Sequence, residues 1–579
     1  MDPKSASQPQ QHRRPNVVFV LTDDQDVHLS SLEYMPLVKK HLLDRGTRFG
    51  SHYATTAVCC PSRVTLWTGK FAHNTNVTDV SPPYGGYPKF VEQGFNEDYL
   101  PVWLQEAGYN VYYTGKLFNV HTVENYNSPA PGGFTGSDFL LDPYTYNYLN
   151  STFQRNGEGP RSYEGQYSTD VLAEKAYGLL DEAVNAGKPF FLVAAPVAPH
   201  ANVVMKASAS DSHRDLDDLP FEFTEPVPAE RHKHLFKDKK VPRTANFNPD
   251  QPSGANWISQ LPRQNDSNVE YNDHFYRQRL RSLQAVDELV DGLFRRLEAH
   301  GVLDNTYFVY SSDNGYHIGQ HRLQPGKSCG YEEDVNVPLI VRGPGVAANY
   351  TTDGAGSGFV TTHADLAPTF FELLGIEQRE DFDGAPIPVT KEGIEEVLRR
   401  GERREHAGIE YWGMAMGEGI HNRNPREHNT YKALRVSGPG YNLYYSVWCN
   451  NEHELYDLSV DPGQLHNLLP SSESTVPSTA TIADYPVPVD KVAARLDALL
   501  LVLKTCAGTT CQRPWAELHP EGGVRTLADA LEPRYDSFYE AQNRTAHVKY
   551  AYCANGFLPD AEGPTWEGLR DGLRWEDWV

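Results

Sequence analysis

The chain alternates short apolar runs with amphipathic segments, and this alternation limits the folds that it can adopt. Asn16–Leu21 is a continuous apolar, β-branched run, typical of a strand that is buried on both faces. The same criteria predict strands at Asn110–Tyr113, Pro189–Ala195, Thr306–Ser311 and Val337–Val341, and helices at Leu100–Ala107, Asp170–Ala186, Asp273–His300 and Leu366–Leu374. Helices that alternate with buried strands indicate an α/β fold with a large, mainly parallel sheet covered by helices on both faces.

The pattern changes after about residue 400, where short strands follow one another across tight turns. Strands are predicted at Ile409–Met414, Tyr431–Ser437, Tyr441–Trp448 and Glu454–Leu458, followed by a loop at Leu469–Pro488 and a helix at Val489–Lys504. Such strands favour a smaller antiparallel α+β unit. We therefore expect a flexible tail at 1–15, a catalytic domain at 16–400 and a C-terminal subdomain at 401–579.

The net charge of the chain excludes some kinds of partner. There are 52 basic and 76 acidic side chains, which gives a formal charge of −24. Because non-specific affinity for nucleic acid comes mainly from basic patches, we expect no nucleic-acid partner. No apolar run has the length of a membrane-spanning helix, so we expect no membrane insertion either. The sequence leaves the oligomeric state open, and an anionic small substrate would need a metal or a local basic cluster.

Polar side chains follow several of the predicted strands directly, namely Asp23, Asp24, Lys116, His200, Asp313 and Asn314. In open α/β sheets, ligands bind at the carboxyl ends of the strands. An isolated Asp-Asp pair is usually a solvated turn, but here a matching Asp-Asn pair follows a second buried strand. These oxygen ligands suit a hard divalent cation, calcium or magnesium, better than zinc.

The most specific local pattern is Cys59-Cys60-Pro61-Ser62-Arg63, followed by Thr68-Gly69-Lys70. Pro61 suits the first turn of a helix, which places Cys59 at an electropositive helix N-terminus and Arg63 one turn further on. A cysteine taken alone is more often a disulfide partner or a buried thiol. Four fixed positions, however, recur by chance only about once in 10⁵ windows.

This pattern, with Leu66 and Thr68-Gly69 behind it, resembles the signature of the type I sulfatases. Val18–Asp24 resembles the first metal motif of that family, Ser312–Gly315 the second, and Glu454–Leu458 the C-terminal signature. The resemblance extends over most of the chain and is strongest to fungal arylsulfatases and glucosamine-6-sulfatases. It implies an alkaline-phosphatase-like sulfatase fold and the hydrolysis of a small sulfate monoester, an aryl sulfate being converted to a phenol and sulfate.

The resemblance also implies a modified nucleophile and a metal ion. A formylglycine-generating enzyme would convert Cys59 to formylglycine, whose hydrated aldehyde is the nucleophile in this family. Calcium, with magnesium as the alternative, would be bound by Asp23, Asp24, Asp313, Asn314 and the modified residue 59.

The remaining site residues follow from the same resemblance. Arg63, Lys116 and Lys327 correspond to groups that bind the sulfate, and His200 to an acid for the leaving oxygen. Many members carry a histidine two residues after the first lysine, where this chain has Phe118, followed by Asn119. We expect Asn119 to act as a hydrogen-bonding substitute. His317 is a candidate for the missing base, or equally a residue of the substrate pocket, and Lys70, His73 and Asn74 are weaker candidates for contact with the site.

Seven cysteines leave an even number once Cys59 serves as the nucleophile precursor. Cys506 with Cys511, Cys449 with Cys553 and Cys60 with Cys329 are candidate disulfides, although connectivity cannot be read from sequence. Five Asn-x-Ser/Thr sequons begin at Asn76, Asn150, Asn265, Asn349 and Asn543. Together these features favour a secreted glycoprotein, although the N-terminal residues contain no apolar leader.

Other functions remain open at this point. Within the sulfatases, the alternative is a glucosamine-6-sulfatase. Among related hydrolases it is a phosphonate or phosphate ester hydrolase, which would share the nucleophile and the metal layout. The non-catalytic alternative is a secreted glycoprotein in which Cys59 remains unmodified.

Overall fold

The computed structural model describes residues 14–205, 221–352, 359–421, 425–469, 481–482, 485–542 and 547–567. Most of the predicted N-terminal tail, much of the predicted loop at 469–488 and the sequon at Asn543 lie outside these residues. Within these ranges, none of the helices combines the length and apolar character that crossing a bilayer requires.

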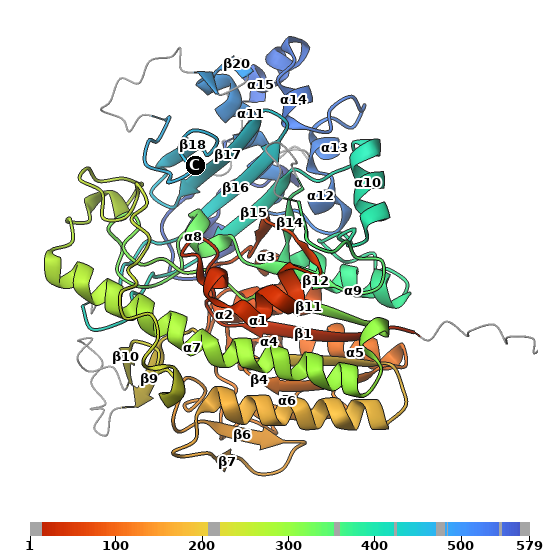
Figure 1. The fold of residues 1–579 in the computed structure, drawn as a ribbon. Helices are drawn as coiled ribbons and strands as arrows, with labels where there is room; N and C mark the ends of the chain where they lie inside the picture. The colour runs from red at the N-terminus through yellow and green to blue at the C-terminus, as the bar shows by residue number, and fades with distance from the viewer. Residues whose placement is uncertain are drawn as a thin grey trace, which may run out of the picture.

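A ten-stranded mixed sheet forms the centre of the molecule (Figure 1). Its inner strands are parallel neighbours in the order β11 (Thr306–Ser312), β1 (Asn16–Thr22), β8 (Phe190–Ala195), β4 (Asn110–Gly115) and β5 (Gly136–Leu140). Shorter strands extend it on either side, namely β12 (Leu339–Arg342), β2 (Thr47–Arg48) and β13 (Tyr350–Thr351) beyond β11, and β6 (Thr152–Arg155) and β7 (Arg161–Ser162) beyond β5. The predicted large, mainly parallel sheet is therefore confirmed.

Alternate side chains of β1 pack into two separate cores, one on each face of the sheet. Phe19 lies on the face covered by α2 (Cys59–Thr68), α5 (Leu100–Glu106) and α9 (Leu366–Leu374), where its ring contacts Trp67. Val18 lies on the opposite face, under α6 (Ser168–Asn185) and α7 (Asp266–Ala299). Helix α7 begins before the predicted residue 273 because Asn265 caps it, with its side chain accepting a hydrogen bond from the Asn268 N–H.

The C-terminal part forms a four-stranded antiparallel sheet, as predicted, above the large sheet in Figure 1. Its strands are β15 (His406–Tyr411), β16 (Tyr431–Gly438), β17 (Tyr441–Trp448) and β18 (His453–Asp457), and α11 (Val489–Leu503) packs against them. The Arg435 guanidinium on β16 lies 2.5 Å from the Glu332 carboxylate on α8 (Glu332–Val335). Both side chains are buried, so this ion pair links the small sheet to the loop that carries Lys327 and His317.

Two of the three candidate disulfides are present. Cys449 is bonded to Cys553 and Cys506 to Cys511. The pairing of Cys60 with Cys329 is wrong, since both are free and buried. Cys60 packs in the core between α2 and the large sheet, whereas Cys329 packs in a different cluster beneath the small sheet, so the two thiols have separate surroundings.

Candidate active site

The site lies where β1 and β11 end side by side. The parallel register pairs Thr22 with Ser312, and this brings the loop after β1 against the loop after β11. The Asp24 N–H donates to Asp313 Oδ1 at 3.0 Å, and Asn314 Nδ2 donates to Asp24 Oδ1 at 2.8 Å. Asp23, Asp24, Asp313 and Asn314 are fully buried. The predicted oxygen ligands are therefore brought together at one edge of the sheet.

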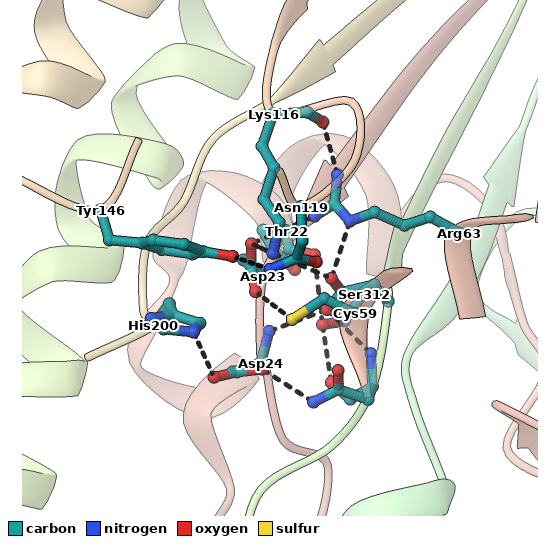
Figure 2. Close-up of polar contacts among 12 residues, drawn as sticks. Thr22, Asp23, Asp24, Cys59, Arg63, Lys116, Asn119, Tyr146, His200 and Ser312 are labelled. Atoms are coloured by element: carbon teal, nitrogen blue, oxygen red, sulfur yellow. Dashed lines mark hydrogen bonds and ion pairs between the residues drawn. The ribbon is translucent and has the colours of Figure 1, made fainter. Parts of the chain in front are cut away.

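Cys59 is the first residue of α2 and points into this cluster (Figure 2). Its Sγ lies 3.4 Å from Asp23 Oδ1 and 3.5 Å from Lys327 Nζ. Burial, and then the Asp23 charge, raise the pKa of the Cys59 thiol well above 9. An unmodified Cys59 is consequently a neutral thiol and a weak nucleophile at neutral pH.

Three buried cations surround the carboxylates. Arg63 Nε donates to Asp313 Oδ2 at 2.8 Å, and its Nη1 donates to the Lys116 carbonyl at 2.6 Å. Lys116 Nζ lies 2.5 Å from Asp23 Oδ2, and Lys327 Nζ lies 2.6 Å from both oxygens of the Asp24 carboxylate.

The charges of these groups depend on one another. Burial raises the pKa of Asp23, but the charge of Lys116, with those of His200 and Arg63, more than offsets it. The pKa of Asp23 is consequently below its ordinary value of 3.8. The carboxylate is therefore ionised at neutral pH and available as a ligand.

The cluster also fits a metal ion. Asn314 Oδ1 is buried and has no hydrogen-bond partner among the described residues. Ligand atoms of Asp23, Asp24, Cys59 and His200 all lie within 4.8 Å of one another. An orphaned amide oxygen beside three buried carboxylates is the kind of donor set that hard divalent cations prefer. The residues therefore fit calcium or magnesium.

His200, which follows β8, is held by its backbone neighbour. Its Nδ1 lies 2.7 Å from the Ala201 carbonyl, which can only accept, so this nitrogen carries a proton. Nε2 therefore faces the site, 3.6 Å from Asp24 Oδ2. Burial, with the Lys327 charge, lowers the pKa of His200 to about 4.

Tyr146 also belongs to the site, and the sequence reasoning missed it. Its ring stacks on His200 with 4.2 Å between centroids, and its hydroxyl accepts a hydrogen bond from Asn119 Nδ2 at 2.7 Å (Figure 2). Asn119 Oδ1 is buried and has no hydrogen-bond partner among the described residues. The polar segment after β5 could have indicated that Tyr146 lies near the site, but this strand was not predicted from the sequence.

Other predicted residues lie elsewhere. His317 Nδ1 is 2.7 Å from Asp334 Oδ1, and its side chain lines a neighbouring cavity that does not include Cys59. Lys70, His73 and Asn74 interact instead with carboxylates of later segments, namely Asp381, Glu410 and Asp383 respectively. These three side chains connect α2 and its neighbour to the C-terminal half of the chain.

A cavity of about 450 Å³ opens above Cys59. We call it the catalytic cavity; its polar lining includes Asn119, His200 and Lys327. The carboxylates of Asp79, Asp142 and Glu418 also line it. The apolar or aromatic part of the lining comprises Val80, Pro143, Tyr146, Val203, Phe223, Tyr411, Met414, Met416 and Pro425. The cavity can therefore hold an apolar group next to the buried charges.

Comparison with known proteins gives consistent results. The model of the sulfatase family matches residues 15–376. An arylsulfatase of Volvox carteri is 40% identical over 561 residues, covering 94% of this chain and 82% of the relative. An N-acetylglucosamine-6-sulfatase of Capra hircus is 30% identical over 534 residues, covering 87% and 85%.

A solved structure of a protein in complex with its substrate D-glucosamine-2-N,6-O-disulfate superimposes with a TM-score of 0.56. It is 23% identical and covers 79% of this chain and 93% of that one. At this level of identity, the similarity concerns the fold.

Proposed function

The chain belongs to the sulfatase family and is a sulfuric ester hydrolase, and we propose that it cleaves aryl sulfates with a formylglycine at position 59 as nucleophile. The observation that carries this proposal is the convergence of three buried cations on the carboxylates beside Cys59 Sγ. Formylglycine, once formed and hydrated, supplies a hydroxyl nucleophile where a buried thiol would be unreactive.

We assign the oxygen cluster to a calcium ion, which when bound would neutralise carboxylate charge and polarise the sulfate. Asp23, Asp24, Asp313 and Asn314 would hold it, because Asn314 Oδ1 and the carboxylates offer only oxygen.

The cations then bind and orient the sulfate. Arg63 is fixed by Asp313 and by the Lys116 carbonyl, so its guanidinium cannot move away from the site. The lysine ammonium groups at 116 and 327 lie on either side of the cluster and can donate to non-bridging sulfate oxygens. Fixed donors of this kind stabilise developing negative charge without reorganisation.

His200 Nε2 is the atom that we assign to proton transfer at the ester oxygen. Because Nδ1 keeps its own proton, donation from Nε2 requires the doubly protonated ring, which the negative charge of a bound sulfate ester would favour. Its Nδ1 is committed to the Ala201 carbonyl, and stacking on Tyr146 fixes the plane of the ring. Asn119, held by the Tyr146 hydroxyl, directly follows Phe118, which stands at the sequence position where many family members carry a histidine. We propose that Asn119 hydrogen-bonds to the nucleophile.

The apolar walls of the catalytic cavity support a phenol as the leaving group. An aromatic ring would pack against Tyr146, Phe223 and Tyr411, and burial of apolar surface contributes about 25 cal/mol per Å². A glucosamine 6-sulfate is the second candidate substrate, because the Capra hircus relative acts as an N-acetylglucosamine-6-sulfatase by its name.

Maturation and compartment belong to the same proposal. Cys59 is only 2% exposed, so a formylglycine-generating enzyme would have to reach it before folding is complete. Two disulfides support a secretory route, because cytosolic proteins rarely retain them.

Mass spectrometry of the peptide that contains residue 59, together with turnover of 4-nitrophenyl sulfate, tests this proposal. We expect an aldehyde at position 59 and loss of turnover in Cys59→Ala expressed beside a formylglycine-generating enzyme. Equal turnover by Cys59→Ala would overturn the nucleophile assignment. Rates on 4-nitrophenyl phosphate and on N-acetylglucosamine 6-sulfate, measured in parallel, test the leaving group and the ester class.

A further inference from the structure

A second cavity, of about 410 Å³, lies next to the catalytic cavity. The two share Lys327 and Met416 in their linings. We call it the cationic cavity, because its lining includes Arg263, Arg322, Arg426, His317 and His421. None of the described residues that line it is an aspartate or a glutamate.

This composition is unusual for the chain. With 76 acidic and 52 basic side chains, an arbitrary patch of this surface is expected to contain more acids than bases. A pocket with three arginines and no acidic lining residue therefore attracts anions locally while the rest of the surface repels them.

The arginine deepest in the cavity has no carboxylate among its described hydrogen-bond partners. Arg322 is 9% exposed, and its guanidinium donates to the carbonyls of Pro249, Asp250 and Leu261 at 2.7–3.0 Å. Carbonyl oxygens orient the group but leave its full charge uncompensated. An anion in the cavity would supply the negative charge that compensates it.

The backbone beneath Arg322 is also held in an unfavourable conformation. His321 and Arg322 have φ angles of 51° and 66°, and the Leu323 N–H donates to the Gln320 carbonyl at 2.8 Å. Two successive left-handed residues of this kind normally favour Asn-Gly. Side chains at such positions cost stability, and strained positions cluster at functional sites.

The other two arginines lie nearer the surface. Arg263 contacts the exposed Asp250 carboxylate at 2.9 Å, and Arg426 lies over the Trp257 ring at 5.9 Å. Exposed ion pairs are weak, so the contact with Asp250 does not prevent Arg263 from binding another anion.

Building on the proposed function, we propose that the cationic cavity binds a second anionic group, a sulfate or a carboxylate, of a substrate whose reactive sulfate ester lies at residue 59. Because Lys327 and Met416 border both cavities, one molecule can occupy the two together. The preferred substrate is therefore a multiply charged sulfate ester, and a simple aryl sulfate uses only the catalytic cavity.

The probe for this proposal is a fluorescently labelled dextran sulfate hexasaccharide, whose binding is measured by fluorescence polarisation at several salt concentrations. Binding does not require turnover, so this readout separates the proposal from the proposed function. We expect Arg263→Gln/Arg426→Gln to weaken binding at least tenfold. In parallel, the hexasaccharide should inhibit turnover of 4-nitrophenyl sulfate competitively, and the variant should lose this inhibition while its kcat changes less than twofold.

The matched control is Arg399→Gln/Arg534→Gln, which removes the same charge from exposed ion pairs elsewhere on the surface. It should bind the hexasaccharide as the unsubstituted protein does. Equal weakening in both double variants would show that net charge, and not the cavity, determines binding. Equal affinity of Arg263→Gln/Arg426→Gln and the unsubstituted protein, or no binding by either, would overturn the proposal.

Discussion

The Tyr146 hydroxyl can be removed without disturbing the rest of the site, and this makes Tyr146→Phe a sharp test of the Asn119 assignment. The phenylalanine ring would keep its stacking on His200, at 4.2 Å, and its contact with the Lys116 ammonium, at 4.8 Å. Only the hydrogen bond from Asn119 Nδ2, at 2.7 Å, would be lost. The hydroxyl is the partner that holds the Asn119 amide in place.

The magnitude follows from the burial of that amide. Asn119 Oδ1 already lacks a hydrogen-bond partner among the described residues, so loss of the Nδ2 bond frees the whole amide to rotate. A buried donor left without its partner costs about 1–3 kcal/mol. If that cost falls on the transition state, kcat/KM for 4-nitrophenyl sulfate should decrease roughly 5- to 150-fold.

A double-mutant cycle with Asn119→Ala identifies the route of the effect. Because the hydroxyl acts through Asn119, the double variant should be no slower than Asn119→Ala alone. Each protein is normalised to its formylglycine content by mass spectrometry, and thermal midpoints verify folding. Effects that multiply in the double variant, or a Tyr146→Phe enzyme within twofold of the original, would refute the reasoning.

Three further predictions concern a buried acid, a buried ion pair and the metal ligands. Burial raises the pKa of Glu405 from 4.5 to about 7, so between these pH values the folded state retains a proton that the unfolded state releases. The free energy of unfolding should therefore decrease by about 3 kcal/mol as pH rises from 4.5 through 7. The difference between the urea midpoints at pH 5 and pH 8 should be smaller in Glu405→Gln than in the unsubstituted protein. The Lys432 ammonium lies 2.8 Å from the buried Glu410 carboxylate, so Lys432→Met leaves His73 as the remaining charged partner of Glu410. This substitution should lower the free energy of unfolding, measured by urea titration, by about 3–5 kcal/mol. A decrease below about 1 kcal/mol would contradict the prediction. A chelator should abolish turnover and lower the thermal midpoint, and excess calcium should restore both. Asn314→Ala should need a higher calcium concentration for this restoration. A thermal midpoint that changes with neither chelator nor calcium would contradict the metal assignment.

The fold was largely predictable because strands buried on both faces have continuous apolar sequences. β1, β8 and β11 were recognised in this way, with boundaries within one residue of the structure. The outer strands β5–β7 were missed, because Gly136–Leu140 contains only two large apolar residues and its neighbours are short and polar. The antiparallel direction of β12 could not be predicted, because a short apolar run has the same sequence pattern in a parallel and in an antiparallel strand.

The site was predictable where its residues follow recognised strands or share one helix. Cys59 and Arg63 lie one turn apart on α2, and the acidic ligands follow β1 and β11 directly. The sequence left two roles open for His317, the missing base or a residue of the substrate pocket. The chain turns back, and His317 pairs with Gly326 in a β-bridge that directs its side chain into the cationic cavity.

The cationic cavity could not be predicted from local sequence, because the segments 257–268, 317–329 and 415–421 and Arg426 meet only in the folded chain. In the sequence, none of the three arginines differs from the many other basic residues. Only their convergence in a lining without a described acidic residue distinguishes them, and convergence is a property of tertiary structure.

The catalytic cavity and the cationic cavity differ in net charge, and we therefore expect them to bind anions in different ways. Around residue 59, the three cationic side chains Arg63, Lys116 and Lys327 face four carboxylates, those of Asp23, Asp24, Asp313 and Glu418, which leaves a net charge of −1. A divalent cation held by the aspartates would change the net charge from −1 to +1 and free the lysine ammonium groups to bind a sulfate. Affinity for the reactive sulfate ester should therefore depend on the metal. The cationic cavity contains no described acidic lining residue, so its attraction for an anion should persist after chelation.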